Sequence, residues 1–186
     1  MDLDKVIESR RSFRSLTPVE VTQELLEEIG EKVKLAPSCY NNQPWRFVCV
    51  YEKSILKELH TTLSKGNSWA HDSSMIIAVC TKKDLDCIVK EREYFSFDTG
   101  LATAFLLLKI TDLGLVAHPI AGYNEKRAKE MLGIPHDFSL ICIVVVGKHN
   151  ENYREIFSEE EINSEMNRPE RLKLSEFFFH NRFENE

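Results

Sequence analysis

Two uninterrupted apolar runs, residues 75–80 and 140–146, constrain the fold of this chain most strongly. Both are rich in β-branched residues, and they predict strands that are buried on both faces. Residues 46–51 combine aromatic and β-branched side chains and predict a third strand. Residues 98–113 are apolar nearly all round, which predicts a helix buried in a core or an interface. Because helices and strands are interspersed without the regular alternation of a doubly wound fold, the expected class is α+β.

Local end signals predict two further helices. Thr17 and Glu20 have the spacing of a capping box, so a helix is expected to begin at Thr17. It is expected to end at Ala36, because the proline that follows disfavours helical backbone at the residue before it. A shorter helix is expected over residues 124–132, between an asparagine N-cap and a glycine just past its end.

The length of 186 residues and the apolar content of 42% fit one domain with a substantial core. We therefore expect a single domain over residues 1–186. Residues 149–186 are expected to form a C-terminal extension that is polar and acidic up to residue 166. From residue 172 the extension carries apolar side chains again, which need a surface to pack on, and a partner subunit is the expected one.

Charge and hydropathy exclude two kinds of partner. No apolar run approaches the roughly 20 residues of a bilayer-spanning helix, and the N-terminal segment does not resemble a signal peptide. A net charge of −6 gives no general attraction for nucleic acid, and the cations of residues 126–129 are expected to be a solvated helical face. We therefore expect neither a membrane nor a nucleic-acid partner.

The five cysteines show no C-x-x-C spacing and are expected to be free thiols, most of them buried. Free thiols suit a reducing compartment, so the expected location is the cytoplasm. The six histidines never fall at i, i+4 spacing with a helical glutamate or near paired cysteines. No metal site is therefore expected.

Two segments carry side chains suited to ligand binding. Arg10, Arg11, Ser12 and Arg14 follow a short N-terminal helix, and planar guanidinium groups with a hydroxyl suit a phosphate monoester. The alternative is a solvated basic turn. Residues 36–45 contain three successive neutral amides, which can bind the mixed edge of a flat heteroaromatic ring. The alternative there is a polar loop, since Asn and Pro favour turns.

An ordered series of motifs resembles the FMN-dependent nitroreductases over most of the chain. The series is R-R-S-x-R from residue 10, A-P-S-x-x-N-x-Q-P-W from residue 36, D-x-G-x-A from residue 98, H-P-I-A-G-Y from residue 118 and L-G-I-P from residue 132. The order is specific, whereas each motif alone is not. The resemblance implies a three-layer α+β fold, in which helices flank a central mixed or antiparallel sheet. It also implies a homodimer that forms through long helices and binds two FMN molecules at its interface.

The resemblance assigns individual residues to the flavin, with the loop of residues 37–43 coming from the partner subunit. The residues assigned to FMN are Arg10, Arg11, Ser12, Arg14, Pro37, Ser38, Asn41, Gln43, Ile120, Ala121, Gly122, Arg171 and Lys173. Asn67 and Trp69 would lie beside the ring and line the substrate pocket, although core packing is an alternative for Trp69. Tyr40 and Phe95 are further candidates for the pocket wall.

The chemistry implied by this resemblance belongs to the flavin, which takes a hydride at N5 from NADH or NADPH and passes electrons to an acceptor. No side chain needs to be catalytic, and ping-pong kinetics are expected. The acceptor would be a nitroaromatic, a quinone or another electron-poor small molecule. Two alternatives stay open, namely a protein that stores or senses FMN and a specialised flavin reaction on the same fold.

Overall fold

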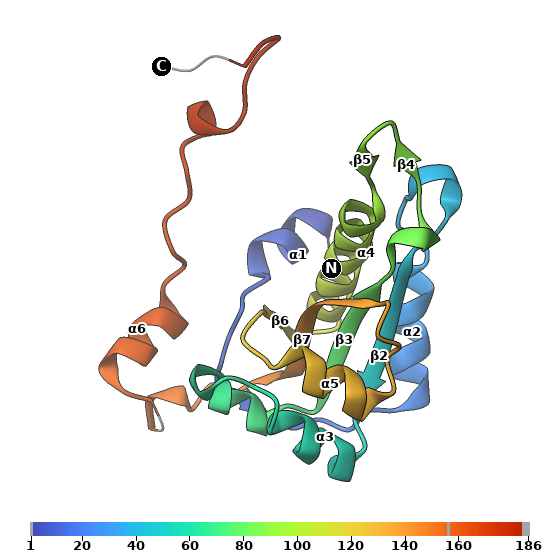
Figure 1. Ribbon diagram of the computed structural model, residues 1–186. Coiled ribbons are helices and arrows are strands. Elements are labelled where there is room, and N and C mark those ends of the chain that lie inside the picture. Colours follow the sequence, from blue (N-terminus) through green and yellow to red (C-terminus); the bar gives the residue numbers. More distant parts are fainter. Residues whose placement is uncertain (1, 156, 184–186) are drawn as a thin grey trace. The chain divides into compact units, whose positions relative to one another are not determined.

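The computed structural model describes residues 2–155 and 157–183, and the chain divides into two compact units, Met1–Glu151 and Asn152–Glu186. The helices of the first unit are α1 (Leu3–Ser9), α2 (Gln23–Val33), α3 (Lys53–His60), α4 (Phe95–Asp112) and α5 (Glu125–Leu132), with 3₁₀ turns η1 (Cys39–Asn41), η2 (Lys65–Asp72) and η3 (Lys83–Leu85). Its strands are β1 (Leu16–Thr17), β2 (Trp45–Val50), β3 (Met75–Thr81), β4 (Ile88–Val89), β5 (Arg92–Glu93), β6 (Val116–Ile120) and β7 (Ser139–His149) (Figure 1). The second unit contains η4 (Tyr153–Glu155), α6 (Glu159–Met166) and η5 (Leu174–Glu176).

The long strand β7 organises the main sheet. It pairs with β3 along one edge, and with β6 and then β1 along the other edge. β2 pairs with the free edge of β3, and all of these pairings are antiparallel. β4 and β5 form a separate small hairpin. An antiparallel sheet combined with helices confirms the α+β class.

Successive residues of β3 pack against different layers of helices, because side chains alternate across a strand. Ile76 and Ala78 join a cluster with α3, η2 and α5, whereas Met75, Ile77 and Val79 join a cluster with α2 and α4. Every residue of β3 is buried, as predicted for a strand covered on both faces. The first unit therefore has three layers, with helices on both faces of the sheet (Figure 1).

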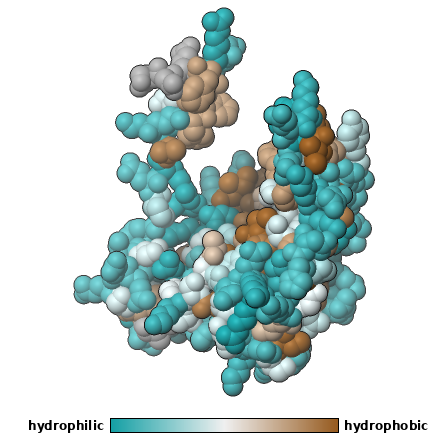
Figure 2. Space-filling model, in the orientation of Figure 1, coloured by the Kyte–Doolittle hydropathy of each residue, from teal (hydrophilic) through white to brown (hydrophobic). Residues whose placement is uncertain are grey.

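The apolar helix predicted from residue 98 is confirmed as α4, which begins at Phe95. Its inner side packs with α2, whereas Phe97 and Phe105 on its outer side are 62% and 39% exposed. α1 contacts α4 and adds the exposed side chains Leu3 and Ile7. Figure 2 shows apolar atoms gathered over α1 and α4, which is typical of a contact surface. Among the described helices, none combines the length and apolar character needed to cross a bilayer.

The helix expected from Thr17 begins instead at Gln23, so that prediction is wrong. Thr17 pairs with β7, and Thr22 caps the helix by accepting a hydrogen bond from the N–H of Leu25 at 3.2 Å. Pairing with the sheet satisfies the backbone of Thr17, and this tertiary contact outweighs the local capping signal. The helix ends at Val33, close to the predicted end.

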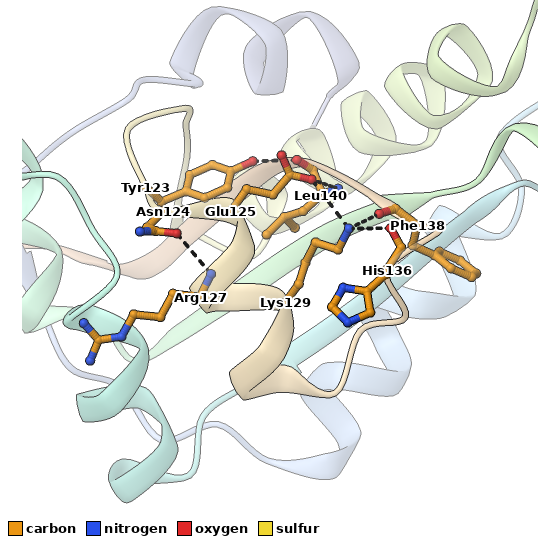
Figure 3. Close-up of polar contacts among 8 residues, drawn as sticks. All are labelled: Tyr123, Asn124, Glu125, Arg127, Lys129, His136, Phe138 and Leu140. Atoms are coloured by element: carbon orange, nitrogen blue, oxygen red, sulfur yellow. Dashed lines mark hydrogen bonds and ion pairs between the residues drawn. The ribbon is translucent and has the colours of Figure 1, made fainter.

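The short helix predicted over residues 124–132 is confirmed as α5. Asn124 accepts from the N–H of Arg127 at 3.0 Å, and Gly133 follows the helix with a φ of 66°. Lys129, however, is not part of a solvated face, because it is buried. Its Nζ donates to the carbonyl of His136 at 3.0 Å and to that of Phe138 (Figure 3). The ammonium group therefore ties α5 to the chain that leads into β7.

Two of the five cysteines are not free thiols, contrary to the prediction. Cys39 and Cys87 form a disulfide across 48 positions of sequence, with their Cα atoms 6.1 Å apart. Cys49, Cys80 and Cys142 are free. Burial raises the pKa of Cys80 and that of Cys142 to about 11, so these thiols stay protonated at neutral pH. Only the fold brings the paired cysteines together, and no local pattern in the sequence predicts it.

The C-terminal unit carries one α-helix among its described residues, α6. Ser158 and Glu161 form a reciprocal capping box at the N-terminus of this helix. Farther along the chain, Phe179 and Phe183 pack with ring centroids 4.5 Å apart, while Leu172 is exposed. The single-domain prediction and the packing of this unit on a partner subunit stay predictions.

Candidate functional site

The basic segment of residues 10–14 connects α1 to β1. Arg10 Nη1 donates to the hydroxyl of Ser12 at 3.3 Å, and the Arg11 guanidinium lies 5.1 Å from the centre of the Phe13 ring. Ser12 and Arg14 are exposed, whereas Arg10 and Arg11 are half-buried. The segment therefore presents three cations and a hydroxyl at the surface of the first unit, as a phosphate site requires.

Phe13 anchors this segment to the sheet. Its ring stacks on His149 of β7 with a centroid distance of 3.8 Å, and its carbonyl oxygen lies 3.1 Å from Nδ1 of His118 in β6. The His118 ring also stacks on Trp69 of η2, with a distance of 4.5 Å between the ring centroids. One chain of contacts therefore joins residues 10–14, β6 and η2 in a single region, which we call the β6 region. Phe13 and His118 were not among the predicted site residues, and their role depends on contacts between distant segments.

Gly122, just past β6, is the point at which η2 meets the predicted flavin strand. Its carbonyl accepts from Asn67 Nδ2 and from the N–H of Ser64, each at 2.9 Å. A Cβ atom at this position would lie 2.6 Å from Asn67 Nδ2, so any side chain would displace that amide. Gly122 therefore allows the close approach of Asn67, a requirement that the sequence prediction did not include.

Trp69 Nε1 is buried and has no hydrogen-bond partner among the residues that the structure describes. Buried donors are nearly always paired, so this one is an exception. The indole is thus packed against the core, one of the two predicted roles, and its N–H is enclosed by the chain itself. Its position beside Asn67 and His118 makes the β6 region a candidate binding site.

Residues 120–122 are held in place by the chain that follows them. Ile120 is buried and pairs with Ile143, whereas Ala121 is exposed. The Tyr123 hydroxyl donates to the carbonyl of Leu140 at 2.7 Å (Figure 3). Burial raises the pKa of Tyr123, so the phenol stays protonated and keeps donating. The exposed backbone after β6 is therefore held in place by contacts with β7 and by α5, which follows it in the chain.

The loop of residues 37–43 has an unusual backbone. Tyr40, Asn41 and Gln43 all have positive φ angles, of 48°, 61° and 51°. Left-handed backbone is uncommon outside glycine, and it persists where surrounding contacts hold it. Ser38 provides one such contact, because its Oγ accepts from the N–H of Gln43 at 2.9 Å. Tyr40 is 90% exposed, so this side chain projects away from its own chain.

Asp98 of α4 anchors this loop. Its Oδ2 accepts from the N–H of Cys39 at 2.6 Å, and the residue is 2% exposed. Burial raises the pKa of the Asp98 carboxyl, and neighbouring Asp86 raises it further. Asp98 was identified only as part of a sequence motif, and no role was assigned to it. Its contact with the loop is visible only in the structure.

A cavity of about 430 Å³ lies between this loop and the start of α4. Tyr40 lines one side of it, and Val89, Tyr94 and Phe97 line the other. Phe95 is half-buried and is not among the lining residues, although its neighbours are. We call the loop together with this cavity the loop region.

The predicted site residues thus fall into separate regions within one chain. In Figure 1, the loop at η1 lies beside the β4–β5 hairpin, well apart from the end of β6. The structure brings residues 10–14 and 120–122 together with Asn67 and Trp69, but it does not bring residues 37–43 to them. Arg171 and Lys173 belong to the C-terminal unit, and their role stays a prediction.

A larger cavity of about 1120 Å³ lies between residues 18–21, α3 and η2. It contains none of the predicted site residues. His60 and His71 line it with ring centroids 4.7 Å apart, and burial lowers the pKa of His60. The cluster Cys39, Asp86 and Cys87 has metal-ligand spacing, but both of its sulfurs are in the disulfide.

Comparisons with known proteins identify the family of this chain. The sequence pattern of the nitroreductase family matches residues 7–73 and 62–148. A protein of Archaeoglobus fulgidus named as an NADH dehydrogenase/NAD(P)H nitroreductase is 31% identical over 147 residues, which cover 77% of this chain and 83% of that protein. The oxygen-insensitive NADPH nitroreductase of Helicobacter acinonychis is 33% identical over 162 residues, covering 68% and 77%. A crystal structure described as an oxidoreductase containing FMN superposes with a TM-score of 0.84 at 28% identity, covering 98% of this chain and 93% of that one. The chain belongs to the nitroreductase family.

Proposed function

We propose that this protein is a homodimeric FMN-dependent oxidoreductase that transfers electrons from NADH or NADPH to electron-poor small molecules. The observation that carries the proposal is the connection of the basic segment to the end of β6 through Phe13 and His118. This connection puts the cations of residues 10–14 and an exposed backbone edge within one region, as a flavin mononucleotide would require. The FMN-containing relative with the same fold supports this reading.

The residues of the β6 region fit a flavin in charge and in hydrogen bonding. Arg10, Arg11, Ser12 and Arg14 would hold the phosphate, because guanidinium groups bind phosphate oxygens in a forked geometry. The backbone of residues 120–122 would face the ring edge, where Gly122 leaves room for the Asn67 amide.

The second subunit would complete each site. Pro37, Ser38, Asn41 and Gln43 lie on a loop that is distant from the β6 region of the same chain, so they would serve the flavin of the partner. The exposed apolar side chains on α1 and α4 support such a dimer, because they need a surface to cover them. Arg171 and Lys173 of the C-terminal unit would add to the phosphate site.

Bound FMN would supply the redox chemistry in two half-reactions, one with NAD(P)H and one with the acceptor. The protein would then bind and orient both substrates in turn at one face, which gives ping-pong kinetics. Cations near the flavin would stabilise negative charge that develops during the reaction. Nitroaromatics and quinones are the proposed acceptors, and Tyr40 with its cavity would form part of the acceptor pocket. We also propose the cytoplasm as the compartment. The three free thiols favour it, whereas the disulfide Cys39–Cys87 does not.

The absorption spectrum of the purified protein, recorded anaerobically before and after addition of NADPH or NADH, tests this proposal. Flavin bands that bleach with either donor and return with a quinone are the expected result. Bands that persist would instead favour a protein that stores FMN. No bands even after addition of FMN would contradict the proposal entirely.

A further inference from the structure

The disulfide Cys39–Cys87 joins two segments that form opposite walls of the loop region. Cys39 begins η1 within the loop of residues 37–43, and Cys87 lies one residue before the β4–β5 hairpin. Both cysteines are half-buried rather than enclosed in the core. The bond is therefore within reach of small thiols and reductants, unlike the buried thiol of Cys80.

The disulfide restrains a loop whose backbone conformation is unfavourable without supporting contacts. Tyr40, Asn41 and Gln43 have positive φ angles, which contacts around them must hold. Asp98 and Ser38 provide two hydrogen bonds to the loop backbone. The disulfide adds a covalent tie directly before Tyr40, at the start of the left-handed stretch.

At the other end of the disulfide, Cys87 precedes the β4–β5 hairpin, which is an element of low intrinsic stability. β4 and β5 are two residues long each, and an isolated two-stranded hairpin is barely stable. Asn42 Nδ2 reaches across to Asp86 Oδ1 and to Cys87 Sγ, each at 3.3 Å. Val89 of the hairpin and Tyr40 of the loop line the same cavity. Breaking the disulfide would therefore loosen the loop and one wall of the cavity together.

We propose that Cys39 and Cys87 form a reversible thiol–disulfide site whose oxidised state holds the loop in its flavin-binding conformation and whose reduced state releases it. This inference rests on the proposed function, which assigns Ser38, Asn41 and Gln43 to the flavin of the partner subunit. Reduction would weaken FMN binding and widen the acceptor cavity. The predicted free thiols and the observed disulfide would then be two states of one protein.

Oxidation would proceed by exchange with a small disulfide such as oxidised glutathione. The Cys39 thiol loses its proton and attacks that disulfide, which forms a mixed disulfide and releases one glutathione. The Cys87 thiol then loses its proton and attacks the sulfur of Cys39, which releases the second glutathione. The two cysteines thus lose two electrons, and the small disulfide gains them as two thiols. Asp86 and Asp98 are the charged groups beside the sulfurs, and their negative charge disfavours an approaching thiolate, so the exchange is expected to be slow.

The test compares four forms of the full-length protein. They are the oxidised wild type, the wild type reduced with an uncharged phosphine, the double variant Cys39→Ser/Cys87→Ser, and the control variant Cys49→Ser, which keeps the disulfide. Intact mass reports the two hydrogens that distinguish the redox states. Hydrogen exchange of residues 38–43 reports the loop, and flavin fluorescence reports the FMN dissociation constant.

We expect exchange of residues 38–43 to quicken and FMN affinity to fall at least tenfold on reduction and in the double variant. Reductant should not change loop exchange or FMN affinity in the double variant. In the control variant, it should change both to the same extent as in the wild type. Equal loop exchange and equal FMN affinity in the oxidised and reduced forms would overturn the inference, as would a mass showing that the disulfide never forms. Failure of every form to bind FMN would instead refute the proposed function, and the hydrogen exchange would still decide whether the disulfide controls the loop.

Discussion

The β6 region and the loop region carry the two halves of the proposed flavin site, and they are stabilised in different ways. The β6 region uses ordinary backbone, ring stacking between Phe13, His149, His118 and Trp69, and support from β7. The loop region has a strained backbone that depends on Asp98, on Ser38 and on a disulfide. The first half is therefore packed directly against the core, whereas the second is attached to it by a few separate contacts.

This difference indicates which half is preformed and which is adjustable. The rings that stack on residues of β6 and β7 can separate only when the sheet itself is disrupted. A surface loop, in contrast, can move while the core stays folded. Mutations that disturb the β6 region should therefore affect stability and FMN binding together. Mutations in the loop region should affect binding with little loss of global stability.

The largest expected effect is a complementation between the two regions. Arg10→Ala and Asn41→Ala each damage one half of the site, so each homodimer should bind FMN poorly. If the loop serves the partner subunit, a mixed dimer of the two variants has one site with both defects and one fully intact site. Differently tagged chains, co-expressed and purified through both tags, should then regain FMN binding at one site per dimer. Mixed dimers as poor as their parents would show that both halves act within one chain.

Lys129→Met should lower the free energy of unfolding by about 2–4 kcal/mol, because it leaves the carbonyls of His136 and Phe138 without their charged donor. Since α5 supports the end of β6, FMN binding should fall as well. Lys126→Met is the matched control on an exposed face of the same helix, and we expect it to change stability by less than about 0.5 kcal/mol. Urea unfolding of the two variants gives the comparison. Equal stability would mean that Lys129 does not support the β6 region.

Arg10→Ala should weaken FMN binding by about 1.5–3 kcal/mol, or roughly 10- to 150-fold, if Arg10 makes a charge-assisted contact with the phosphate. Lys5→Ala removes an exposed cation from nearby α1 and is the control for a general loss of charge. Riboflavin lacks the phosphate, so its affinity should not change in the Arg10 variant. A parallel loss of riboflavin affinity would assign Arg10 to the ring rather than to the phosphate.

Asp98→Asn should have the smallest of these effects, a change in how stability depends on pH. The folded state raises the pKa of Asp98, so it binds the proton more tightly than the unfolded state does. Its contribution to stability is therefore full at low pH and is lost as the pH rises through the folded-state pKa. The amide still accepts from the N–H of Cys39, so the variant should lack this loss. Thermal unfolding between acid and neutral pH measures it, with exposed Asp84→Asn as the control.

Much of the β6 region was predictable from single segments. Residues 10–14, residues 120–122, Asn67 and Trp69 were each predicted as site residues, and the structure brings them together, while their roles in binding stay predictions. What joins them was not predictable, because Phe13 and His118 act through one hydrogen bond across 105 positions of sequence. A phenylalanine within a basic turn carries no signal of such a contact.

The motif of residues 36–45 predicted that this loop is part of a site. The conformation of its backbone is explained only by contacts with other segments. Asn41 is suited to a turn, but the left-handed backbone of this loop depends on contacts from α4 and from the segment before the hairpin. The prediction that all five thiols are free was wrong for the same reason, since proximity of Cys39 and Cys87 follows from the fold. The error at Thr17 is similar, because pairing with β7 overrode a capping signal.

The sequence by itself determined the buried strand β3, the strand β7, which is exposed at Ile141 within its predicted buried run, the apolar helix α4, the capped helix α5 and the order of motifs that marks the family. Each of these depends on periodicity or on side chains a few positions apart, which act within one element. Tertiary structure alone decided the disulfide, the burial of Lys129 and the separation of the two half-sites. Those features depend on contacts between segments that are distant along the chain, where the free energy of packing outweighs local preference.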